Sequence, residues 1–555
     1  MMSDSANIAR HLSLMAGRQP HHAALKIPRP RKKGPAHADI DYLSLSFTEL
    51  EVEVDAWAAH LSAHGLRAGD RTLVMVRQGL PLVAAAFALF KLGAVPILID
   101  PGMGLKSFLA CVARSRPTAL VGITLAQVMS RVFRPSFRSV NLRFSASGNP
   151  LTRRAIAGGR ISRFESIPRE TTDLAAILFT SGSTGAPKGV CYEHGMFEAQ
   201  VRLIQKTYAI EPGEIDLPML PIFALFNPAL GMTTVVPEID PSRPAAVDPA
   251  KIVQAIQQEK VTNSFGSPTL WNKIADHCIA EAITLPTLRR VLCAGAPVPA
   301  ALWKKSRQFI SRGKLHSPFG ATEALPVSSV SVDEVETVQG TGACVGRPVR
   351  EIEVNIIATR DGTLATRAET RDLPPGEIGE IIVQGPVVTK RYDALAEATA
   401  AAKIGAFAEI SSASSDVEIW HRMGDCGYLD KEGRLWFCGR KAERVQTAAG
   451  DVFTEPCEHV FRDHPAVARC ALIGLGRPGE ARPALVVQPK EKLSGSARKT
   501  LAGELRERGR SQPATTAIVD FFFHPQFPED VRHNAKIHRN TLATWAAKTT
   551  PVTVV

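Results

Sequence analysis

The sequence lacks the features that would place the protein in a membrane or outside the cell. Its nine cysteines are scattered and form no C-x-x-C pair, so neither a disulfide framework nor a zinc site is indicated. The longest apolar stretch, residues 82–90, is far shorter than the roughly 20 residues that a membrane helix needs. Arg10 and His11 interrupt the apolar stretch near the N-terminus, which argues against a signal peptide. We therefore expect a cytoplasmic protein without a membrane span.

Negative charge is in deficit, because 54 acidic residues face 66 lysines and arginines and the formal net charge is +12. Such an excess suggests an anionic partner, of which nucleic acid is the first to consider. The basic residues are nevertheless spread along the chain, without a helix-turn-helix, zinc-finger or RNA-recognition pattern. We therefore expect no nucleic-acid partner. A nucleotide-using enzyme with an acidic substrate accounts for the charge.

The 555 residues, 45% of them hydrophobic, predict a globular chain of roughly three to four packed units. Residues 47–66 have a helical apolar stripe, for which Thr48 is the expected cap and Glu51 completes a capping box. Further helices and continuous apolar strands then alternate, which is typical of α/β domains with a covered parallel sheet. The expected strands are 69–76, 95–100, 175–180, 214–221 and 288–298, the expected helices are 81–94 and 193–210, and 249–268 adds a helix and a strand.

The second half of the chain changes character. Residues 361–386 contain Gly/Pro turns and alternating strands, which predict a small β unit. Residues 426–430 and 434–438 then form a hairpin-like pair around the Glu432-Gly433 turn. A separate α+β segment follows Arg440, so we place a domain boundary there.

The stretch FTSGSTGAPKG, Phe179 to Gly189, has the composition of a phosphate-binding loop. It does not follow the Walker spacing, because Pro187 occupies the second glycine position counted from Gly182. We place it between a strand and a helix, where hydroxyl groups and backbone N–H groups surround a triphosphate and Lys188 adds charge. A plain linker is the alternative for a Gly/Ser-rich turn. The expected phosphate-binding residues are Thr180, Ser181, Gly182, Ser183, Thr184, Gly185 and Lys188.

This stretch resembles the signature of the adenylate-forming superfamily, which includes acyl-CoA synthetases, peptide-adenylation domains and luciferases. Five further motifs follow in the order of that superfamily. They are CAGAP at 293–297, FGATE at 319–323, MGDCG at 423–427, CGRKAERV at 438–445 and HNAKIHR at 533–539. Each motif alone has an ordinary structural interpretation, such as a turn or a solvated charge. Their joint order supports the resemblance.

The resemblance implies ATP and Mg²⁺ as cofactors and gives each motif a role. The adenine side consists of Gly295, Ala296, Pro297, Phe319, Gly320 and Ala321, although Phe319 also suits an ordinary core position. Thr322 contacts the α-phosphate, Glu323 binds magnesium, and Asp425 and Arg440 contact the ribose side. Lys536 reaches the transferring carboxylate, so the implied catalytic residues are Lys536, Glu323 and Thr184.

The same resemblance implies the domain organisation. An N-terminal adenylate-forming domain of parallel-sheet α/β subdomains and a small β unit occupies 1–438. Residues 439–442 are the expected hinge, and a smaller, mobile α+β lid occupies 443–555. Superfamily members often carry Asp or Lys two residues after the hinge arginine, where this chain has Ala442. The pivot is therefore expected at Lys441 or in a differently built joint.

Segments such as FALFNPALG, HRMGDCGY and FPEDVRHNAKIHR resemble one branch, the β-lactone synthetases of bacterial long-chain olefin biosynthesis, from about residue 5 to about residue 547. The branch implies adenylation of a long-chain 2-alkyl-3-hydroxy fatty acid, attack by its own β-hydroxyl, and a multi-enzyme assembly with other olefin-biosynthesis enzymes. The alternative is a long-chain fatty acyl-CoA synthetase. Phe223, Leu225 and Phe226 either line the acyl pocket or pack beneath it. His194, His316 and His533 are the candidates for a base, each with a structural interpretation as well.

One departure affects the acyl site. Many acyl-CoA synthetases carry a histidine after a Pro-Leu-Phe stretch, whereas this chain has Ala224 after Pro-Ile-Phe. A gating role carried by that histidine therefore cannot be transferred to this chain.

Overall fold

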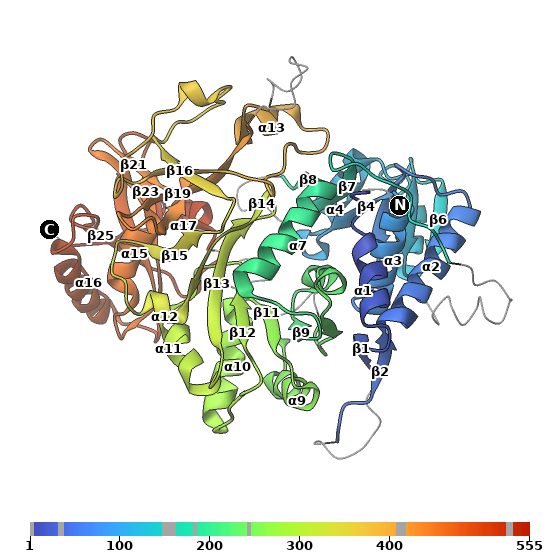
Figure 1. Cartoon of the computed structure of the whole chain (residues 1–555). Coiled ribbons are helices and arrows are strands. Elements are labelled where there is room, and N and C mark those ends of the chain that lie inside the picture. Colours follow the sequence, from blue (N-terminus) through green and yellow to red (C-terminus); the bar gives the residue numbers. More distant parts are fainter. Residues whose placement is uncertain are drawn as a thin grey trace. The chain divides into compact units, whose positions relative to one another are not determined.

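The computed structural model describes residues 5–30, 38–146, 163–180, 186–240, 246–406, 418–528 and 537–554. They divide into two compact units that alternate along the chain, whose course is traced in Figure 1. Unit 1 consists of Met1–Val332, Val349–Ile352 and Gln384–His421, and unit 2 of Asp333–Pro348, Glu353–Val383 and Arg422–Val555. None of the helices in these described segments is both long and apolar enough to span a bilayer.

The first sheet of unit 1 is almost entirely parallel, as the sequence predicts. Its strands in spatial order are β6 (Leu142–Ser145), β5 (Ala119–Gly122), β3 (Arg71–Met75), β4 (Val95–Ile99), β7 (Leu174–Thr180) and β8 (Lys188–Glu193). Only β8 runs antiparallel to its neighbour. Both faces are covered, because α2 (Phe47–Ala63) and α3 (Leu80–Lys91) belong to one core cluster, and α4 (Leu105–Ser115) and α5 (Thr124–Val132) to another.

The second sheet of unit 1 is parallel in its interior. The order is β14 (Ala324–Ser331), β13 (Lys314–Ala321), β12 (Arg290–Cys293), β11 (Asn263–Gly266), β9 (Ile215–Pro218), β10 (Thr233–Val235), β1 (Ala23–Pro28) and β2 (Tyr42–Ser46). β14 and β2 pair antiparallel with their neighbours, whereas β13 through β1 are parallel. The associated helices are α7 (His194–Tyr208), α9 (Pro249–Glu259), α10 (Pro268–Ala280) and α11 (Ala300–Phe309).

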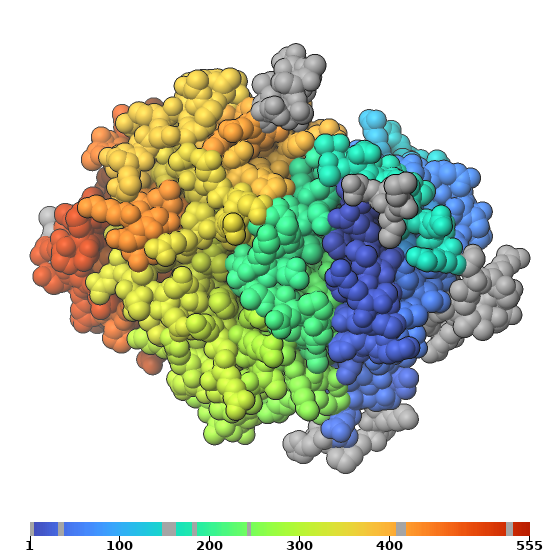
Figure 2. Space-filling model, in the orientation of Figure 1, coloured from blue at the N-terminus to red at the C-terminus, as the bar shows by residue number. Residues whose placement is uncertain are grey.

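Shorter elements complete unit 1. They are α1 (Arg10–Arg18), η1 (Pro101–Met103), η2 (Pro221–Leu225), α8 (Asn227–Leu230), α13 (Ala396–Ala402) and β18 (Lys403–Ile404). Helices α1 and α7 lie side by side at the surface in Figure 2, where His11 and Glu198 form a hydrogen bond of 2.6 Å. This contact ties the N-terminal helix to the body of unit 1.

Unit 2 contains a β unit and a C-terminal α+β segment. The first includes β16 (Glu353–Ile357), β17 (Gly379–Gln384), β19 (Trp420–Leu429), β20 (Leu435–Arg440) and β15 (Ala343–Pro348), in that spatial order. The second has the sheet β23 (Val467–Leu475), β24 (Arg482–Pro489), β25 (Asp520–Phe523) and β26 (Val552–Thr553), with α15 (Thr454–Arg462), α16 (Gly495–Arg510) and α17 (Arg539–Ala546). The elements α12 (Val332–Val335), η4 (Arg367–Glu369), η5 (Lys441–Glu443), β21 (Val445–Thr447) and β22 (Gly450–Val452) complete the description.

The expected helices and strands before residue 300 are confirmed, and the hairpin of β19 and β20 turns where the sequence placed it. The alternating strands expected over 361–386 are wrong, because that stretch contains one strand, β17, and the short helix η4. The cap of α2 is wrong by two residues. Ser46 is the cap, because its hydroxyl accepts a hydrogen bond from the Glu49 amide at 3.2 Å while the Glu49 carboxylate accepts one from the Ser46 amide at 2.7 Å. The Glu51 carboxylate instead accepts a hydrogen bond from the Lys91 ammonium at 2.6 Å. Glu51 therefore takes part in a tertiary contact and not in the expected capping box.

The phosphate-loop stretch does not lead directly into a helix. Lys188–Glu193 forms β8, which pairs antiparallel with β7 and places Thr180 opposite Lys188. Helix α7 begins only at His194. The buried Val190 and Tyr192 explain the strand, since residues of this kind pack well on a sheet. The expected strand–loop–helix arrangement is therefore wrong.

Candidate active site

Three groups of sequence-predicted site residues follow the parallel strands β12, β13 and β9 of the second sheet, with β11 between β12 and β9. Gly295–Pro297 come after β12, and Phe319–Glu323 extend from the end of β13 into the turn before β14. Phe223 follows β9 in the short helix η2. Because the carboxyl ends of parallel strands meet at one edge of a sheet, these residues gather there, where open α/β sheets bind ligands.

Glu323 is positioned by contacts to both its side chain and its backbone. The hydroxyl of Tyr392 donates to its Oε1 at 2.7 Å. The Glu323 carbonyl accepts hydrogen bonds from the Thr389 amide at 2.9 Å and from the Thr389 hydroxyl at 3.1 Å. Tyr392 thus orients the carboxylate, and Thr389 fixes the backbone of the same residue. Burial together with the charge of Glu323 raises the pKa of the Tyr392 phenol, which therefore stays a donor.

A buried lysine contacts one of the two residues that bind Glu323. Lys403, whose side chain is 1% exposed, donates to the Thr389 hydroxyl at 3.2 Å. Burial lowers its pKa to about 7, although the charge of Glu323 opposes that shift. Beside it, the buried His421 forms a hydrogen bond to the Ala402 carbonyl at 3.1 Å, and burial holds the pKa of His421 well below its usual value. A neutral imidazole therefore packs next to the lysine.

The FGATE turn leaves no room for a side chain at its glycine. A Cβ at Gly320 would lie 2.7 Å from the Ala324 carbonyl oxygen, a distance that real Cβ atoms do not show. Phe319 is half-buried on β13, and the Tyr192 hydroxyl donates to the Thr322 carbonyl. The turn is therefore anchored by close backbone approach at Gly320 and by the tyrosine at Thr322.

In the neighbouring loop, Gly295 adopts a φ of 98°, a left-handed conformation that favours glycine. It is exposed, Ala296 is half-buried and Pro297 is exposed. The Ala294 amide donates to the Gly266 carbonyl at 3.1 Å, which fixes the start of this loop against β11. The loop therefore leaves the sheet edge with its surface open to a ligand.

The proposed acyl-pocket residues occupy mixed environments. The ring of Phe223 stacks on Phe265 of β11 with a centroid distance of 3.6 Å. Leu225 and Phe226 are partly buried against the main core cluster of unit 1. Ala224, at the position of the histidine found in many acyl-CoA synthetases, is buried. Core packing is thus established for Leu225 and Phe226, and their role in acyl binding stays a prediction.

Lys188 begins β8 with an exposed side chain, and its Nζ lies 4.8 Å from the centroid of the Tyr392 ring. The same tyrosine therefore contacts both the predicted phosphate lysine and Glu323. Five predicted phosphate-binding residues lie outside the described residues, as does the side chain of Thr180. They are Ser181, Gly182, Ser183, Thr184 and Gly185.

In unit 2, the predicted ribose-side residues face each other across the hairpin. Asp425 on β19 lies opposite Arg440 on β20, and the guanidinium Nη1 is 2.7 Å from Asp425 Oδ1. The aspartate side chain is 5% exposed, whereas that of the arginine is 33% exposed. The two residues that the sequence predicts to contact the ribose side therefore form an ion pair within one hairpin.

The predicted hinge begins at a residue that must be glycine. Gly439 has a φ of 129°, and a Cβ there would lie 2.1 Å from the Thr454 hydroxyl oxygen. Two residues on, the Lys441 ammonium pairs with the buried Glu380 carboxylate at 2.9 Å, which also accepts from Arg422 at 2.8 Å. Lys441 is thus anchored by charge, and the hinge at 439–442 stays a prediction.

The three candidate bases have different outcomes. His194 is buried, its Nδ1 accepts a hydrogen bond from the Ile8 amide at 3.3 Å, and burial lowers its pKa to about 4. That position is structural. His316 packs edge-on against Tyr208 with centroids 5.6 Å apart, and His533 lies outside the described residues. Lys536, the implied catalytic lysine, also lies outside them.

Sequence reasoning missed Tyr392, Thr389 and Lys403. All three lie in the 384–421 segment, between the FGATE and MGDCG motifs and outside any recognised pattern. The available signal was composition, because the chain has only five tyrosines. The contacts of Tyr392 and Thr389 to Glu323 depend on pairing across about 70 positions, which no local pattern encodes.

The donor set suits magnesium carried by a nucleotide. Mg²⁺ is usually held by one or two carboxylates together with substrate phosphates and water, and Glu323 supplies one such carboxylate. No group of three acidic, histidine or cysteine side chains arranged to hold a metal occurs within the described ranges. Glu323 therefore fits the role of a single protein ligand to a metal whose other ligands come from phosphate.

The chain is similar to proteins of a known family. Residues 16–393 match the model of the family described as AMP-binding enzyme. The chain is 42% identical to the olefin beta-lactone synthetase of Xanthomonas campestris pv. campestris, over 99% of this chain and 98% of that protein. It is 27% identical to a feruloyl-CoA synthase of an Amycolatopsis species, over 80% of this chain and 84% of that one.

A solved structure has the same fold. The O-succinylbenzoate coenzyme A synthetase of Bacillus subtilis, in complex with ATP and magnesium ion, superposes with a TM-score of 0.72. The two chains are 23% identical, and the match covers 96% of this chain and 98% of that one.

Proposed function

Because the chain belongs to the AMP-binding enzyme family, we propose that this adenylate-forming ligase converts a 2-alkyl-3-hydroxy fatty acid into a β-lactone. The observation that carries the proposal is the 42% identity to an olefin beta-lactone synthetase, which extends over 99% of the chain. The acid is activated with ATP to an acyl adenylate and pyrophosphate. The β-hydroxyl of the same molecule then attacks the acyl carbonyl, and AMP leaves.

The first step brings two anions together, and the chain offers residues for that problem. Glu323 would hold magnesium, which when bound neutralises phosphate charge. Lys188 and Lys536 would contribute positive charge near the phosphates and the carboxylate, as preorganised electrostatic groups do in phosphoryl transfer. Tyr392 and Thr389 support this assignment, because the Tyr392 hydroxyl binds the Glu323 carboxylate and Thr389 binds the Glu323 backbone carbonyl.

The second step needs no external nucleophile. In the adenylate, the β-hydroxyl and the acyl carbon belong to one molecule, and this proximity offsets the strain of a four-membered ring. The hydroxyl oxygen forms the new C–O bond, its proton passes to solvent or to a base, and the bond from the acyl carbon to AMP breaks. Phe223 would line the acyl site, with Leu225 and Phe226 supporting it from the core.

The second candidate is a fatty acyl-CoA synthetase, because the 27%-identical relative is a feruloyl-CoA synthase. In that case a thiol would attack the same adenylate. We further propose that the protein acts in the cytoplasm and assembles with other olefin-biosynthesis enzymes, and that the joint at 439–442 moves the 443–555 domain between steps.

Product analysis separates the two candidates. The purified protein is incubated with ATP, magnesium and a 2-alkyl-3-hydroxy acid, with and without CoA, and the products are weighed by mass spectrometry. We expect a product lighter than the acid by one water, with stoichiometric AMP and no effect of CoA. An acid without the β-hydroxyl should remain as a bound adenylate. If that plain acid turns over only with CoA and yields a thioester, the chain is an acyl-CoA synthetase instead.

Lys536 provides a matched variant for this assay. Lys536→Ala should lower pyrophosphate release by about a hundredfold or more, the scale for loss of one transition-state charge. The neighbouring Lys548→Ala, in the same C-terminal segment, serves as the control. Near-normal release from Lys536→Ala would remove this lysine from the mechanism.

A further inference from the structure

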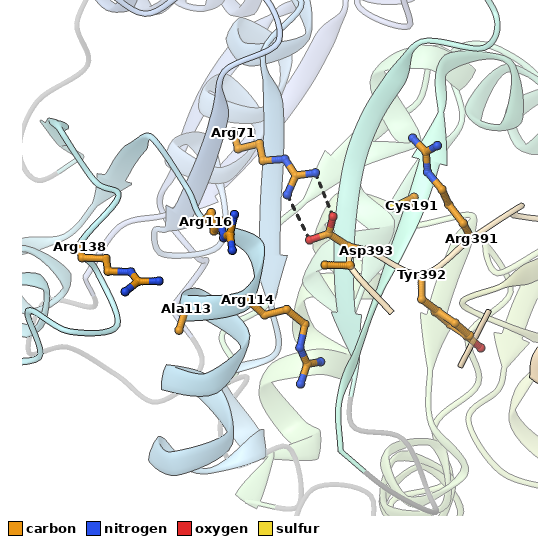
Figure 3. Close-up of a pocket in the computed structure, with 10 residues that line it drawn as sticks. Arg71, Ala113, Arg114, Arg116, Arg138, Cys191, Arg391, Tyr392 and Asp393 are labelled. Atoms are coloured by element: carbon orange, nitrogen blue, oxygen red, sulfur yellow. Dashed lines mark hydrogen bonds and ion pairs between the residues drawn. The ribbon is translucent and has the colours of Figure 1, made fainter. Parts of the chain in front are cut away.

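Unit 1 contains a concave site whose lining is rich in arginine. The cavity measures about 680 Å³ and has five arginines in its wall (Figure 3). They come from separate parts of the chain: the start of β3, the end of α4, the stretch after α5 and the segment beside β8. The five are Arg71, Arg114, Arg116, Arg138 and Arg391.

One arginine is neutralised and structural. Arg71 pairs with both oxygens of the buried Asp393 at 2.9 and 3.2 Å, the contacts drawn in Figure 3, and also donates to the Ser115 carbonyl at 2.9 Å. Asp393 is the one acidic side chain among the described residues that line the cavity. Four positive charges of the lining are therefore left without a negative partner within it.

The wall is held by backbone pairing. The segment that carries Arg391 and Asp393 runs along β8, where Val190 bridges Tyr392. The Asp393 amide donates to the Gly189 carbonyl at 2.7 Å. On the opposite side, Arg114 Nη1 donates to the Pro187 carbonyl at 2.8 Å. The cavity is thus framed by a sheet strand and a helix end rather than by a loose surface.

A thiol does not supply the missing negative charge. Cys191 on β8 lines the cavity, but burial raises the pKa of its thiol to about 11. The thiol is therefore neutral at pH 7. The charge of the lining stays strongly positive.

Helix stabilisation explains only part of the cluster. Arg114 lies in the last turn of α4, where a cation complements the helix dipole, and Arg116 caps the same helix in a left-handed conformation. Arg138 and Arg391 belong to other segments and have no such role. Arg116, Arg138 and Arg391 are exposed, so solvent screens part of their mutual repulsion, and a bound anion would neutralise the rest.

We propose that this cavity binds an oligophosphate anion, such as pyrophosphate or the phosphate chain of a nucleotide. The planar guanidinium group presents paired donors that match phosphate oxygens. Four unmatched arginines suit an anion with several charges better than a single carboxylate. A volume of about 680 Å³ lies in the range of small-ligand sites and holds such an anion.

The site is distinct from the candidate active site but adjoins it. Arg71 is the first residue of β3, so this part of the cavity lies at the amino end of a parallel strand rather than at a carboxyl end. Tyr392 connects the two sites, because it is one of the lining residues and its side chain, directed away from the arginines in Figure 3, binds Glu323 through the hydroxyl. A test must therefore report on the cavity residues themselves.

Arginine modification provides that resolution. The full-length protein is treated with phenylglyoxal with and without inorganic pyrophosphate, in the absence of magnesium, and modified peptides are quantified by mass spectrometry. At tenfold excess over its Kd, pyrophosphate should slow modification of Arg116, Arg138 and Arg391 by about tenfold. Arg131 and Arg134, exposed and outside the cavity lining, should react at an unchanged rate.

Calorimetry with matched variants gives an independent readout. The wild type should have one more pyrophosphate-binding site than the double variant Arg116→Ala/Arg138→Ala. The control variant Arg131→Ala/Arg134→Ala should have the same number of sites as the wild type. Thermal unfolding checks that the double variant is folded. If the double variant is unfolded, the phenylglyoxal labelling of the wild type alone tests whether the cavity binds pyrophosphate.

The outcomes separate the sources of the ligand. Protection by pyrophosphate alone, or stronger protection by ADP, supports an oligophosphate site and distinguishes an inorganic ligand from a nucleotide. Equal modification of Arg116, Arg138 and Arg391 with and without both ligands would overturn the proposal. Protection by a hexaglutamate peptide but by neither phosphate ligand would also overturn it, in favour of an acidic protein partner. None of these measurements requires turnover, so they stand apart from the proposed reaction.

Discussion

Glu323 and Asp425, the two carboxylates that the sequence assigns to nucleotide binding, are held in opposite ways. Glu323 accepts a hydrogen bond from the neutral Tyr392 hydroxyl, and the buried Lys403 donates to Thr389 rather than to this carboxylate. Asp425 faces the guanidinium of Arg440 at 2.7 Å. One negative charge is oriented without being neutralised, and the other is neutralised by its partner.

This difference suits different ligands. A carboxylate that keeps its charge attracts a hard cation, which prefers anionic oxygen. A carboxylate already paired with arginine has spare acceptor capacity but little net charge, which suits sugar hydroxyls. The contrast therefore supports the proposal that Glu323 binds magnesium and Asp425 binds hydroxyl groups, and each role has its own test.

The largest effect is expected from Glu323→Gln. The amide keeps the shape and the contact with Tyr392 but loses the charge that a hard cation needs, so turnover should fall by about a hundredfold or more. Turnover measured across a magnesium titration should also show a higher midpoint, while binding of the fatty acid without ATP stays unchanged. A magnesium midpoint equal to that of the wild type would place the metal elsewhere and remove the contrast.

Asp425→Asn should act on ATP binding instead. Loss of the charge that orients Arg440 should raise the KM for ATP by about thirtyfold, near the 2 kcal/mol of a charged hydrogen bond, with a smaller change in kcat. Steady-state kinetics at varied ATP provide the measurement. The magnesium midpoint should match the wild type, and a shift as large as that of Glu323→Gln would mean that the two carboxylates share one role.

A smaller effect is expected from Tyr392→Phe, which removes the hydroxyl that orients Glu323. Loss of one hydrogen bond to a carboxylate should reduce kcat/KM by about tenfold, and turnover should regain part of that loss at high magnesium. Tyr208→Phe is the matched control, since its hydroxyl bonds to Ser329 at 3.0 Å. Equal losses in the two variants would show that the Tyr392 hydroxyl supports only the fold.

Asp216 shows what happens to a carboxylate with neither a cation nor solvent. It accepts a hydrogen bond from the Asn227 amide at 2.8 Å, and burial raises its pKa to about 7. Folding therefore favours its protonated form, so the stability that it contributes is complete below pH 3.8 and is lost as the pH rises through 7. The free energy of unfolding should fall by about 2 kcal/mol from pH 5 to 7 through this group.

Chemical denaturation of wild type and Asp216→Asn at pH 5 and pH 7 measures this loss. The asparagine should abolish the Asp216 part of the pH dependence without changing turnover. If both proteins lose equal stability over that interval, Asp216 does not titrate there.

Much of the fold could be predicted because it depends on short-range patterns. The buried strand at 95–99 and the helix at 80–91 follow from continuous apolar stretches, and the β19–β20 hairpin follows from its Glu432-Gly433 turn. The predictions were wrong where a residue that fits a local sequence rule instead contacts a residue far away in the chain. Glu51 fits a capping box by spacing, but Lys91 binds it, and the loop after β7 meets strand β8 because that stretch buries its side chains.

The sequence by itself determined the order of the nucleotide motifs, and hence the chemistry, because each motif needs only a few consecutive residues with suitable backbone freedom and charge. The tertiary structure decided which groups orient those motifs. Tyr392 reaches Glu323, and Arg138 and Arg391 converge on one cavity, through contacts between segments far apart in the chain. Such contacts depend on how sheets and helices pack to bury apolar surface, and local spacing carries no information about that geometry.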